Sequence, residues 1–147
     1  MSSLWWSLRL RREAASVPIA RHLLLCSMEA AGVDPEVAYD MSLALSEACA
    51  NAVEHGSASG DLAGAYRVSA YLEGDRCRIE VADTGPGFPA GYDPARCANE
   101  AESGRGLYLI ESLADHVRLR NRPGRGGAVV SFDKVLARRD GALLPAS

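Results

Sequence analysis

The sequence predicts an α+β fold: a two-layer sandwich in which a mixed, mostly antiparallel sheet carries about three helices on one face. Segments with helical spacing of apolar residues and segments with a period of two follow in the order β-α-α-β-β-α-β-β. The 147 residues, 48% hydrophobic and 24% charged, are typical of a single globular domain. We expect this domain over residues 1–137 and a disordered tail over 138–147.

One strand and two helices are expected first. Residues 4–12 alternate between apolar and polar side chains from Leu8 onward, which is enough to predict a strand. Ser16 is a candidate N-cap for the first helix, which Gly32 would end. Asp34 is a candidate N-cap for the second helix, whose apolar residues keep helical spacing up to Gly56.

The rest of the chain predicts a hairpin, a long irregular segment, a helix and two more strands. The hairpin joins strands 65–73 and 76–83 through a tight turn at Gly74 and Asp75. No period survives over 84–104, which favours a functional loop or lid in so compact a domain. The remaining regular segments are a helix over 106–114 and strands over 116–121 and 127–135.

The basic residues exclude two classes of nucleotide-binding protein. Fifteen of the sixteen are Arg, and Lys134 is the only Lys. A P-loop requires G-x-x-x-x-G-K-[ST], and a conventional protein kinase requires a strand Lys that holds the phosphates. Because neither motif surrounds Lys134, any nucleotide must be bound by other means.

The cysteines and the N-terminus indicate a cytoplasmic protein. Trp5 and Trp6 precede the first arginines, the reverse of a signal peptide, and no apolar run approaches the roughly 18 residues of a membrane span. The four cysteines lack metal or redox spacing, so we expect small hydrophobic residues in a reducing cytosol. They are Cys26, Cys49, Cys77 and Cys97.

The charge is uneven along the chain. Residues 34–102 carry thirteen acids against four Arg, whereas 103–147 carry eight bases against four acids. No aromatic or recognition-helix pattern accompanies the basic end, so a solvated face explains it. We expect no direct nucleic-acid partner and no membrane partner.

The first motif is SEACANAVEHG, 46–56, at the end of the second predicted helix. Glu47, Asn51 and His55 recur every four residues, and each step drifts by only about 40° around the helix, so they share one stripe. Such a stripe is usually a solvated face. An Asn beside a Glu also suits a magnesium–phosphate site, where the amide ligates the cation and the carboxylate orients a hydroxyl.

The second motif is ADTGPGF, 82–88, directly after a strand. Asp83 closes the strand, and Gly85 and Gly87 let the backbone approach a flat ligand closely. An ordinary turn is one explanation. The other is adenine recognition, because a carboxylate accepts a hydrogen bond from the exocyclic amine of adenine, whereas guanine presents an oxygen there.

The third motif is SGRGLYLIESLAD, 103–115, in which Gly104 and Gly106 precede a predicted helix. The unpaired backbone N–H groups of a helix N-terminus can bind phosphate, and Arg105 would add a positive charge. By itself this pattern is better explained by a plain helix entry.

In this order, the three motifs resemble the nucleotide site of the GHKL ATPase superfamily, which has the Bergerat fold. More narrowly, S-E-A-x-x-N-A-x-x-H-G resembles the anti-sigma-factor serine/threonine kinases, and ASVPIARHLL resembles their stand-alone actinobacterial members. The resemblance covers about Leu8 to Val135. It implies binding of ATP and Mg²⁺ in a pocket closed by a lid over about 89–103.

The resemblance also implies roles for the motif residues. Glu47 would be the general base, Asn51 would ligate Mg²⁺, and Asp83 would bind the adenine amine, flanked by Gly85 and Gly87. The lid hinge and phosphate cradle would be formed by Gly104, Arg105, Gly106 and Leu107.

Two positions limit these implied roles. Ala128 follows Gly126 and Gly127 where many relatives carry Thr, which weakens the expectation of tight adenine binding. His55 fits the pattern, but a capping or packing role suits it equally.

The resemblance and the length together favour a protein kinase acting on another protein. We expect 147 residues to leave no room for a histidine kinase's phospho-accepting domain, and His22 lacks an acidic neighbour. The implied function is a serine/threonine kinase that phosphorylates a small antagonist protein and sequesters a sigma factor, regulating transcription as a homodimer. The alternative is an ATP-dependent binding module without kinase activity.

Overall fold

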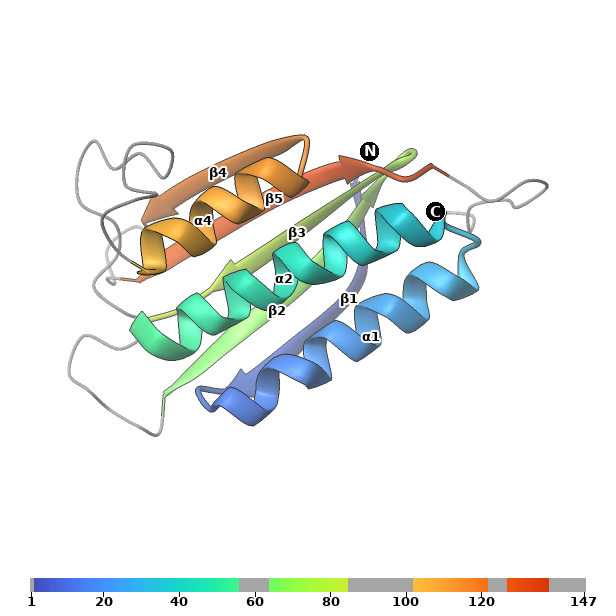
Figure 1. Ribbon diagram of the computed structural model, residues 1–147. Helices are drawn as coiled ribbons and strands as arrows, with labels where there is room; N and C mark the ends of the chain where they lie inside the picture. Colours follow the sequence, from blue (N-terminus) through green and yellow to red (C-terminus); the bar gives the residue numbers. More distant parts are fainter. Residues whose placement is uncertain (1, 56–63, 85–101, 122–126, 138–147) are drawn as a thin grey trace.

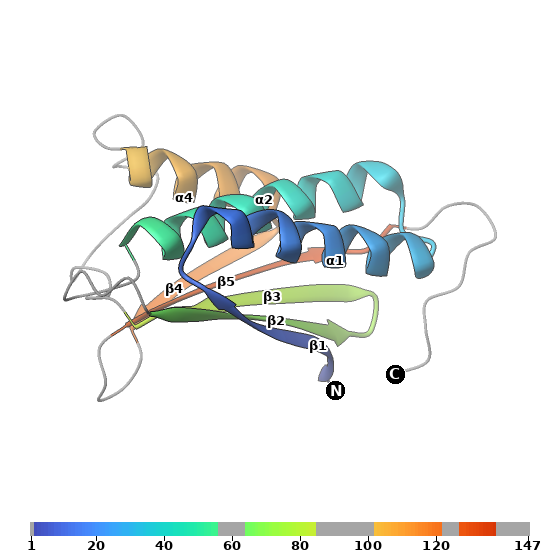
Figure 2. The ribbon, with the colours of Figure 1, turned by 90° about the horizontal axis from the view of Figure 1, so that it is seen from below.

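The computed structural model describes residues 2–55, 64–84, 102–121 and 127–137, and the predicted tail over 138–147 lies outside this part. Three α-helices cover one face of a five-stranded sheet, so the predicted α+β sandwich is confirmed (Figures 1 and 2). No helix of the described part is long and apolar enough to cross a membrane. In chain order the elements are β1 (Ser2–Arg11), η1 (Ala14–Ser16), α1 (Val17–Ala30), α2 (Pro35–His55), β2 (Ala65–Glu73), β3 (Arg76–Ala82), α4 (Glu102–Leu113), β4 (His116–Asn121) and β5 (Ala128–Val135).

The sheet has the order β1-β2-β3-β5-β4, and all four pairings between these strands are antiparallel. The expectation of a mixed sheet was therefore wrong for the described strands. Two helices separate β1 from β2 and return the chain to the end where β1 stopped, so β2 runs back antiparallel (Figure 1). One helix separates β3 from β4, which makes them run the same way, but β5 lies between them.

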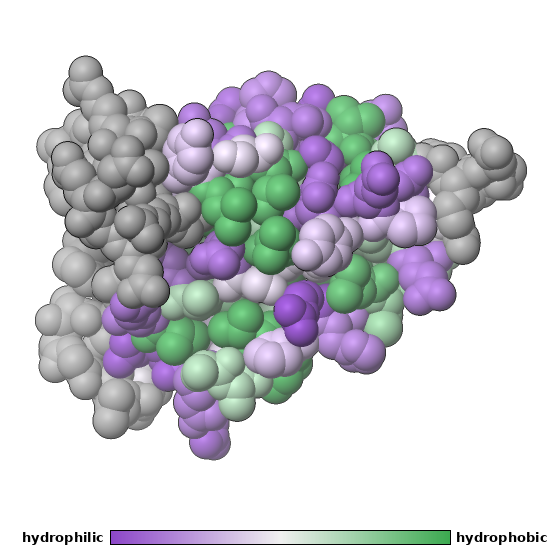
Figure 3. Space-filling view, viewed as in Figure 1, coloured by the Kyte–Doolittle hydropathy of each residue, from purple (hydrophilic) through white to green (hydrophobic). Residues whose placement is uncertain are grey.

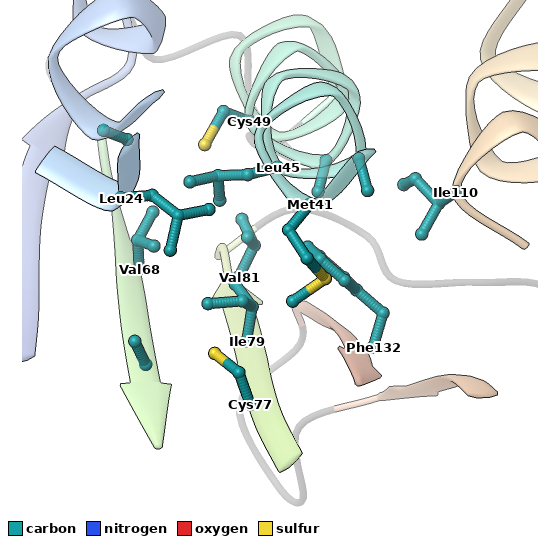
Figure 4. Packing of buried hydrophobic residues seen from close by; sticks show 14 of the residues in the cluster. Leu24, Met41, Leu45, Cys49, Val68, Cys77, Ile79, Val81, Ile110 and Phe132 are labelled. Atoms are coloured by element: carbon teal, nitrogen blue, oxygen red, sulfur yellow. The ribbon is translucent and has the colours of Figure 1, made fainter. Parts of the chain in front are cut away.

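The core lies between the sheet and the helices (Figure 4). Strand alternation directs every second side chain toward the helices, and α2 lies between α1 and α4 above β3 (Figure 1). Trp5 and Trp6 pack against the edge of this core and are partly buried. Fully buried members include Leu24, Met41, Leu45, Cys49, Val68, Cys77, Ile79, Ile110 and Phe132.

The two expected helix caps turned out differently. Asp34 caps α2, since its Oδ1 accepts the Glu36 N–H at 2.8 Å. Ser16 makes no side-chain cap for α1, so that expectation was wrong. Its buried hydroxyl instead donates to the carbonyl of Glu13 at 2.7 Å and is hydrogen-bonded to the Tyr66 hydroxyl, which ties η1 to β2.

The β2–β3 turn has the predicted two residues, Gly74 and Asp75. Gly74 has φ 65, a left-handed conformation that glycine adopts without a steric penalty and that two-residue hairpins require. The predicted hairpin is thus confirmed.

The cysteines of the described part fall into two classes. Cys49 and Cys77 are buried in the core, as expected, and burial raises the pKa of each thiol to about 12. Burial, together with the neighbouring Cys49, also raises the pKa of Tyr66. Cys26 departs from the expectation, because it is exposed on α1 with its Sγ 3.5 Å from Nε2 of His22.

This difference predicts selective thiol chemistry in a Cys97→Ser background, which leaves only these three cysteines. At pH 8 a thiol with a pKa of about 12 is thiolate in roughly one molecule in ten thousand, and the core also excludes the reagent. We expect Ellman's reagent to modify one equivalent, Cys26, in the native protein and three equivalents after unfolding. Rapid release of three equivalents from the native protein would contradict the packing of Cys49 and Cys77.

Candidate functional site

The fold brings the three sequence motifs to one end of the molecule. The C-terminal end of α2, the end of β3, the start of β5 and the N-terminal end of α4 all lie at the left in both ribbon views (Figures 1 and 2). We call this the motif end. Gly85, Gly87 and residues 89–101 of the expected lid lie outside the described part, whereas Glu102 and Ser103 already belong to α4.

On α2, Glu47 and Asn51 stand one turn apart and are both half-buried. The neighbouring Ala44, Ala48 and Ala52 are at most 1% exposed. Small residues let the helix approach its neighbours closely, so the polar stripe is drawn partly into the fold. The ordinary explanation of such a stripe is a fully solvated face. Glu47 and Asn51 do not fit it, because both are half-buried. His55 is the last residue of α2, and its side chain lies outside the description.

Asp83 is a buried carboxylate, 6% exposed, held at the end of the central ladder. Its N–H donates to the Ala128 carbonyl at 2.9 Å, and its Oδ1 accepts the Ala128 N–H at 3.0 Å. Both contacts use the backbone of Ala128, so a methyl side chain there does not weaken them. The sequence alone could not reveal this partner, because it depends on the register that pairs Ala82 with Val129.

The glycines of the third motif lie inside α4, which begins at Glu102, so the expectation that Gly104 and Gly106 precede the helix was wrong. Each interior glycine costs about 1 kcal/mol of helix propensity, which is why the pattern predicted a later start. Tertiary packing overrides this cost, since Leu107 and Ile110 are at most 1% exposed and anchor α4 on the core. The Leu107 side chain therefore packs in the core, and only the backbone of the first turn, which includes Gly104, can present N–H groups to a phosphate.

Lys134 lies away from the motif end. Its Nζ donates to the Leu113 carbonyl at 2.9 Å, at the C-terminal end of α4. A cation there interacts favourably with the unpaired carbonyls and the helix dipole. The only Lys thus stabilises the far end of the helix whose first turn reaches the motif end. Sequence reasoning missed this role, because Lys134 lies on β5, 21 positions after Leu113, and the last turn of α4 itself contains no basic residue.

The described residues include no group of three His, Cys, Asp or Glu side chains that could hold a metal ion. A magnesium ion commonly takes one or two protein ligands and completes its shell with phosphate oxygens and water. The half-buried amide of Asn51 suits that arrangement, because a neutral oxygen ligand need not bind the cation before a nucleotide arrives.

The outer surface of the helical layer is mixed in character, with hydrophobic patches among hydrophilic residues (Figure 3). Two tyrosines contribute to it: Tyr39 of α2 is 63% exposed and Tyr108 of α4 is 47% exposed. This face is therefore neither uniformly charged nor continuously apolar.

Comparisons with known sequences agree with this geometry. A family model described as a histidine kinase-like ATPase domain matches residues 10–134. The serine-protein kinase RsbW of Bacillus subtilis is 36% identical over 102 residues, covering 63% of this chain and 63% of the relative. RsbW of Listeria innocua is 30% identical over 122 residues, covering 77% of each. The chain thus spans somewhat less than two thirds of the Bacillus relative's length.

Solved structures give the same fold. The RsbU and RsbW domains of Rv1364c from Mycobacterium tuberculosis match with a TM-score of 0.67 and 26% identity, over 96% of this chain and 35% of that one. The SiaB–SiaC complex from Pseudomonas aeruginosa matches with a TM-score of 0.60 and 17% identity, over 90% and 91% of the two chains. At 17% identity, the second likeness concerns the fold alone.

The Asp83–Ala128 contact predicts a graded effect on stability. Asp83→Ala removes the acceptor and leaves a buried N–H without a partner, which costs about 1–3 kcal/mol in the free energy of unfolding. Asp83→Asn keeps an amide oxygen at the same place and is expected to cost less than about 1 kcal/mol. Urea unfolding of both variants measures the difference. Equal losses would mean that the charge, rather than the acceptor, stabilises this end of the ladder.

Proposed function

The chain belongs to the histidine kinase-like ATPase domain family, and from this premise we propose that it is an ATP-dependent serine/threonine protein kinase similar to RsbW. The observation that carries the proposal is the meeting of all three motifs at one end of the molecule, with Glu47 and Asn51 half-buried and Asp83 buried there (Figures 1 and 2). The relatives named serine-protein kinase support the choice of a hydroxyl acceptor.

Nucleotide binding in this proposal begins with Asp83. Its Oδ1 is held by the Ala128 N–H, which fixes the plane of the carboxylate. Its other oxygen accepts the exocyclic amine of adenine, a charge-assisted hydrogen bond worth about 1.5–3 kcal/mol. Gly85 and Gly87 flank the base. The N–H groups at the start of α4, with Gly104, Arg105 and Gly106, bind the phosphates.

Phosphoryl transfer then uses the polar stripe of α2. Glu47 accepts the hydroxyl proton of the acceptor serine as the serine oxygen attacks the γ-phosphorus. The bond between the γ-phosphorus and the oxygen that bridges it to the β-phosphate breaks, and ADP leaves. Asn51 ligates the Mg²⁺ carried by the phosphates, which neutralises charge that develops on them. The rigid helix fixes both side chains one turn apart, so the protein contributes mainly positioning.

The partners in this proposal are proteins. The resemblance to RsbW suggests a small antagonist protein as the phosphate acceptor and a sigma factor as the sequestered partner, in the cytoplasm, with the kinase as a homodimer. The SiaB–SiaC complex shows the same fold crystallised with a second protein. A candidate acceptor can therefore be sought among small proteins that co-purify with this chain.

A second function, an ATP-dependent binding module without transfer, differs from the first at one residue. A module that only changes shape with ATP needs Asp83 and Asn51 but has no use for a base. Glu47 stands half-buried one turn before Asn51, where a base is needed. Its position favours the kinase.

The first test is Glu47→Ala. We expect unchanged ATP affinity with phosphotransfer reduced by about 10²-fold or more, because the base is lost while the nucleotide contacts remain. The assay incubates the protein with Mg²⁺ and radiolabelled ATP in a lysate of its own organism and measures label on serine and threonine. Glu36→Ala, which removes an exposed carboxylate from the other end of α2, serves as the matched control.

Undiminished transfer by Glu47→Ala would refute the base. ATP binding without transfer by the wild-type protein would instead support the binding module.

The second test is Asp83→Asn. We expect this variant to fold, because it keeps an oxygen acceptor for the Ala128 N–H. With its oxygen on the Ala128 N–H, the Asn side chain turns its NH₂ toward the adenine amine, so two donors face each other. We expect ATP affinity to fall by at least about tenfold, as measured by calorimetry. The wild-type protein should prefer ATP to GTP, and the variant should lose that preference. Tight ATP binding by the variant would overturn the adenine assignment.

A further inference from the structure

The face of the sheet that points away from the helices is covered by no element of the described part (Figure 2). We call it the open face. Strand registers give its side chains directly, because residues paired across antiparallel strands point to the same side. Near the motif end, one such row crosses all five strands. In strand order it consists of Arg9, Arg67, Ala82, Val129 and Arg120.

This arginine row holds three arginines and no acid, whereas the three rows beside it are balanced in charge. Each of these rows contains one acid and one arginine: Glu80 and Arg118, Asp133 and Arg78, and Glu73 and Arg76. The positive excess of the open face thus lies near the motif end, in the arginine row and in Arg11 of the row beyond it, in a protein whose net charge is -3.

The arginines of the open face differ in how they are neutralised. Arg78 is ion-paired with Glu73 at 2.8 Å, and Arg76 with Asp133 at 2.6 Å. Arg9 and Arg118 have no ion pair or hydrogen bond with side chains of the described part. Arg67 donates to the Ser7 hydroxyl at 3.3 Å, which supplies no negative charge.

Arg9 and Arg67 are direct cross-strand partners. Like charges at such positions destabilise a sheet unless an anion lies between them. The edge pair β1–β2 therefore carries an unfavourable pairing of like charges, which a bound anion would offset. Arg120 provides a third cation on the far side of Ala82 and Val129. Its side chain is 56% exposed and forms an ion pair with Glu80 at 3.7 Å, and Glu80 is also ion-paired with Arg78.

We propose that the arginine row is a docking surface for an acidic segment of a partner protein, which lies across the strands and places carboxylates on Arg9, Arg67 and Arg120. Charge complementarity selects this occupant. The row spans four strand spacings, about 19 Å, which suits a segment of about six extended residues. Arg118 in the next row adds a fourth cation.

Two other occupants fit less well. A single-stranded nucleic acid requires stacking platforms, and the aromatic ring of this face, Tyr71, is covered by the Arg78 guanidinium at 4.2 Å. The same face of a second copy would bring arginine rows against each other.

The surface is independent of the proposed kinase site. Ala82 and Val129 point to the open face, whereas the adjacent Asp83 and Ala128 belong to the motif end on the helical side. Variants of the arginine row should therefore retain ATP binding. If the arginine row binds no acidic segment, the proposed kinase function is unaffected. If the kinase tests fail, the proposed docking surface is likewise unaffected.

The test measures binding of a fluorescent deca-glutamate peptide to the full chain by anisotropy in low salt. We expect saturable binding that weakens in 0.5 M salt, and a loss of about tenfold in affinity for Arg9→Glu and for Arg67→Glu. Arg9→Lys should bind as the wild type does. Arg21→Glu, the same charge change at an exposed residue of α1, is the matched control and should bind normally.

The proposal would be overturned if the peptide did not bind in low salt, or if Arg21→Glu lost as much affinity for the peptide as Arg9→Glu does. It would also be overturned if a ten-residue oligothymidylate bound more tightly than the peptide and Arg9→Glu abolished that binding. Thermal unfolding shows whether each variant is folded and whether the peptide binds it. The peptide should raise the melting temperature of the wild type but not that of folded Arg9→Glu. Arg9→Thr without peptide should unfold at a temperature no lower than the wild type, since it removes the repulsion with Arg67.

Discussion

The position of α2 constrains most of this structure. The helix contacts α1 on one side, α4 on the other and the sheet below, so only a narrow strip of it can be polar. Ala44, Ala48 and Ala52 allow this close packing, and their small volume brings Glu47 and Asn51 partly into the fold beside them. A larger residue at these alanines would push α2 outward, and overpacking of this kind typically costs 1–3 kcal/mol. The same packing therefore stabilises the core and fixes the spacing of the two side chains proposed for catalysis.

The two ends of α4 are held in different ways. At its C-terminal end, Lys134 donates to the Leu113 carbonyl, and the N–H of Asp115 donates to the Asp133 carbonyl just beyond the helix. Along its length, Leu107 and Ile110 pack in the core. The first turn, which contains Gly104, depends on the rest of the helix for its position. A helix anchored at its far end and through its middle keeps the N–H groups of its first turn in place.

Much of the fold followed from the sequence because periodicity and turn chemistry are local. The hairpin at Gly74, the Asp34 cap and the order of the elements needed only neighbouring residues. The failures involved distant partners. Ser16 bonds to Tyr66, fifty positions away, instead of capping α1, and α4 begins early because Leu107 finds a place in the core. The motif residues were recognisable as a set, but the contact between Asp83 and the Ala128 backbone depends on strand register, which no short motif specifies.

The central ladder also relates the proposed nucleotide contact to the arginine row. Strands β3 and β5, like β2, are each paired on both sides, so they are held more firmly than the edge strands β1 and β4. Successive residues on them point to opposite faces. Asp83 and Ala128 therefore lie on the helical side of the sheet at the motif end. Ala82 and Val129, one residue away on each strand, belong to the arginine row on the open face. A nucleotide and an acidic segment would be separated by one thickness of a well-paired sheet. Neither would obstruct the other, so a bound partner on the open face would leave the proposed kinase site accessible.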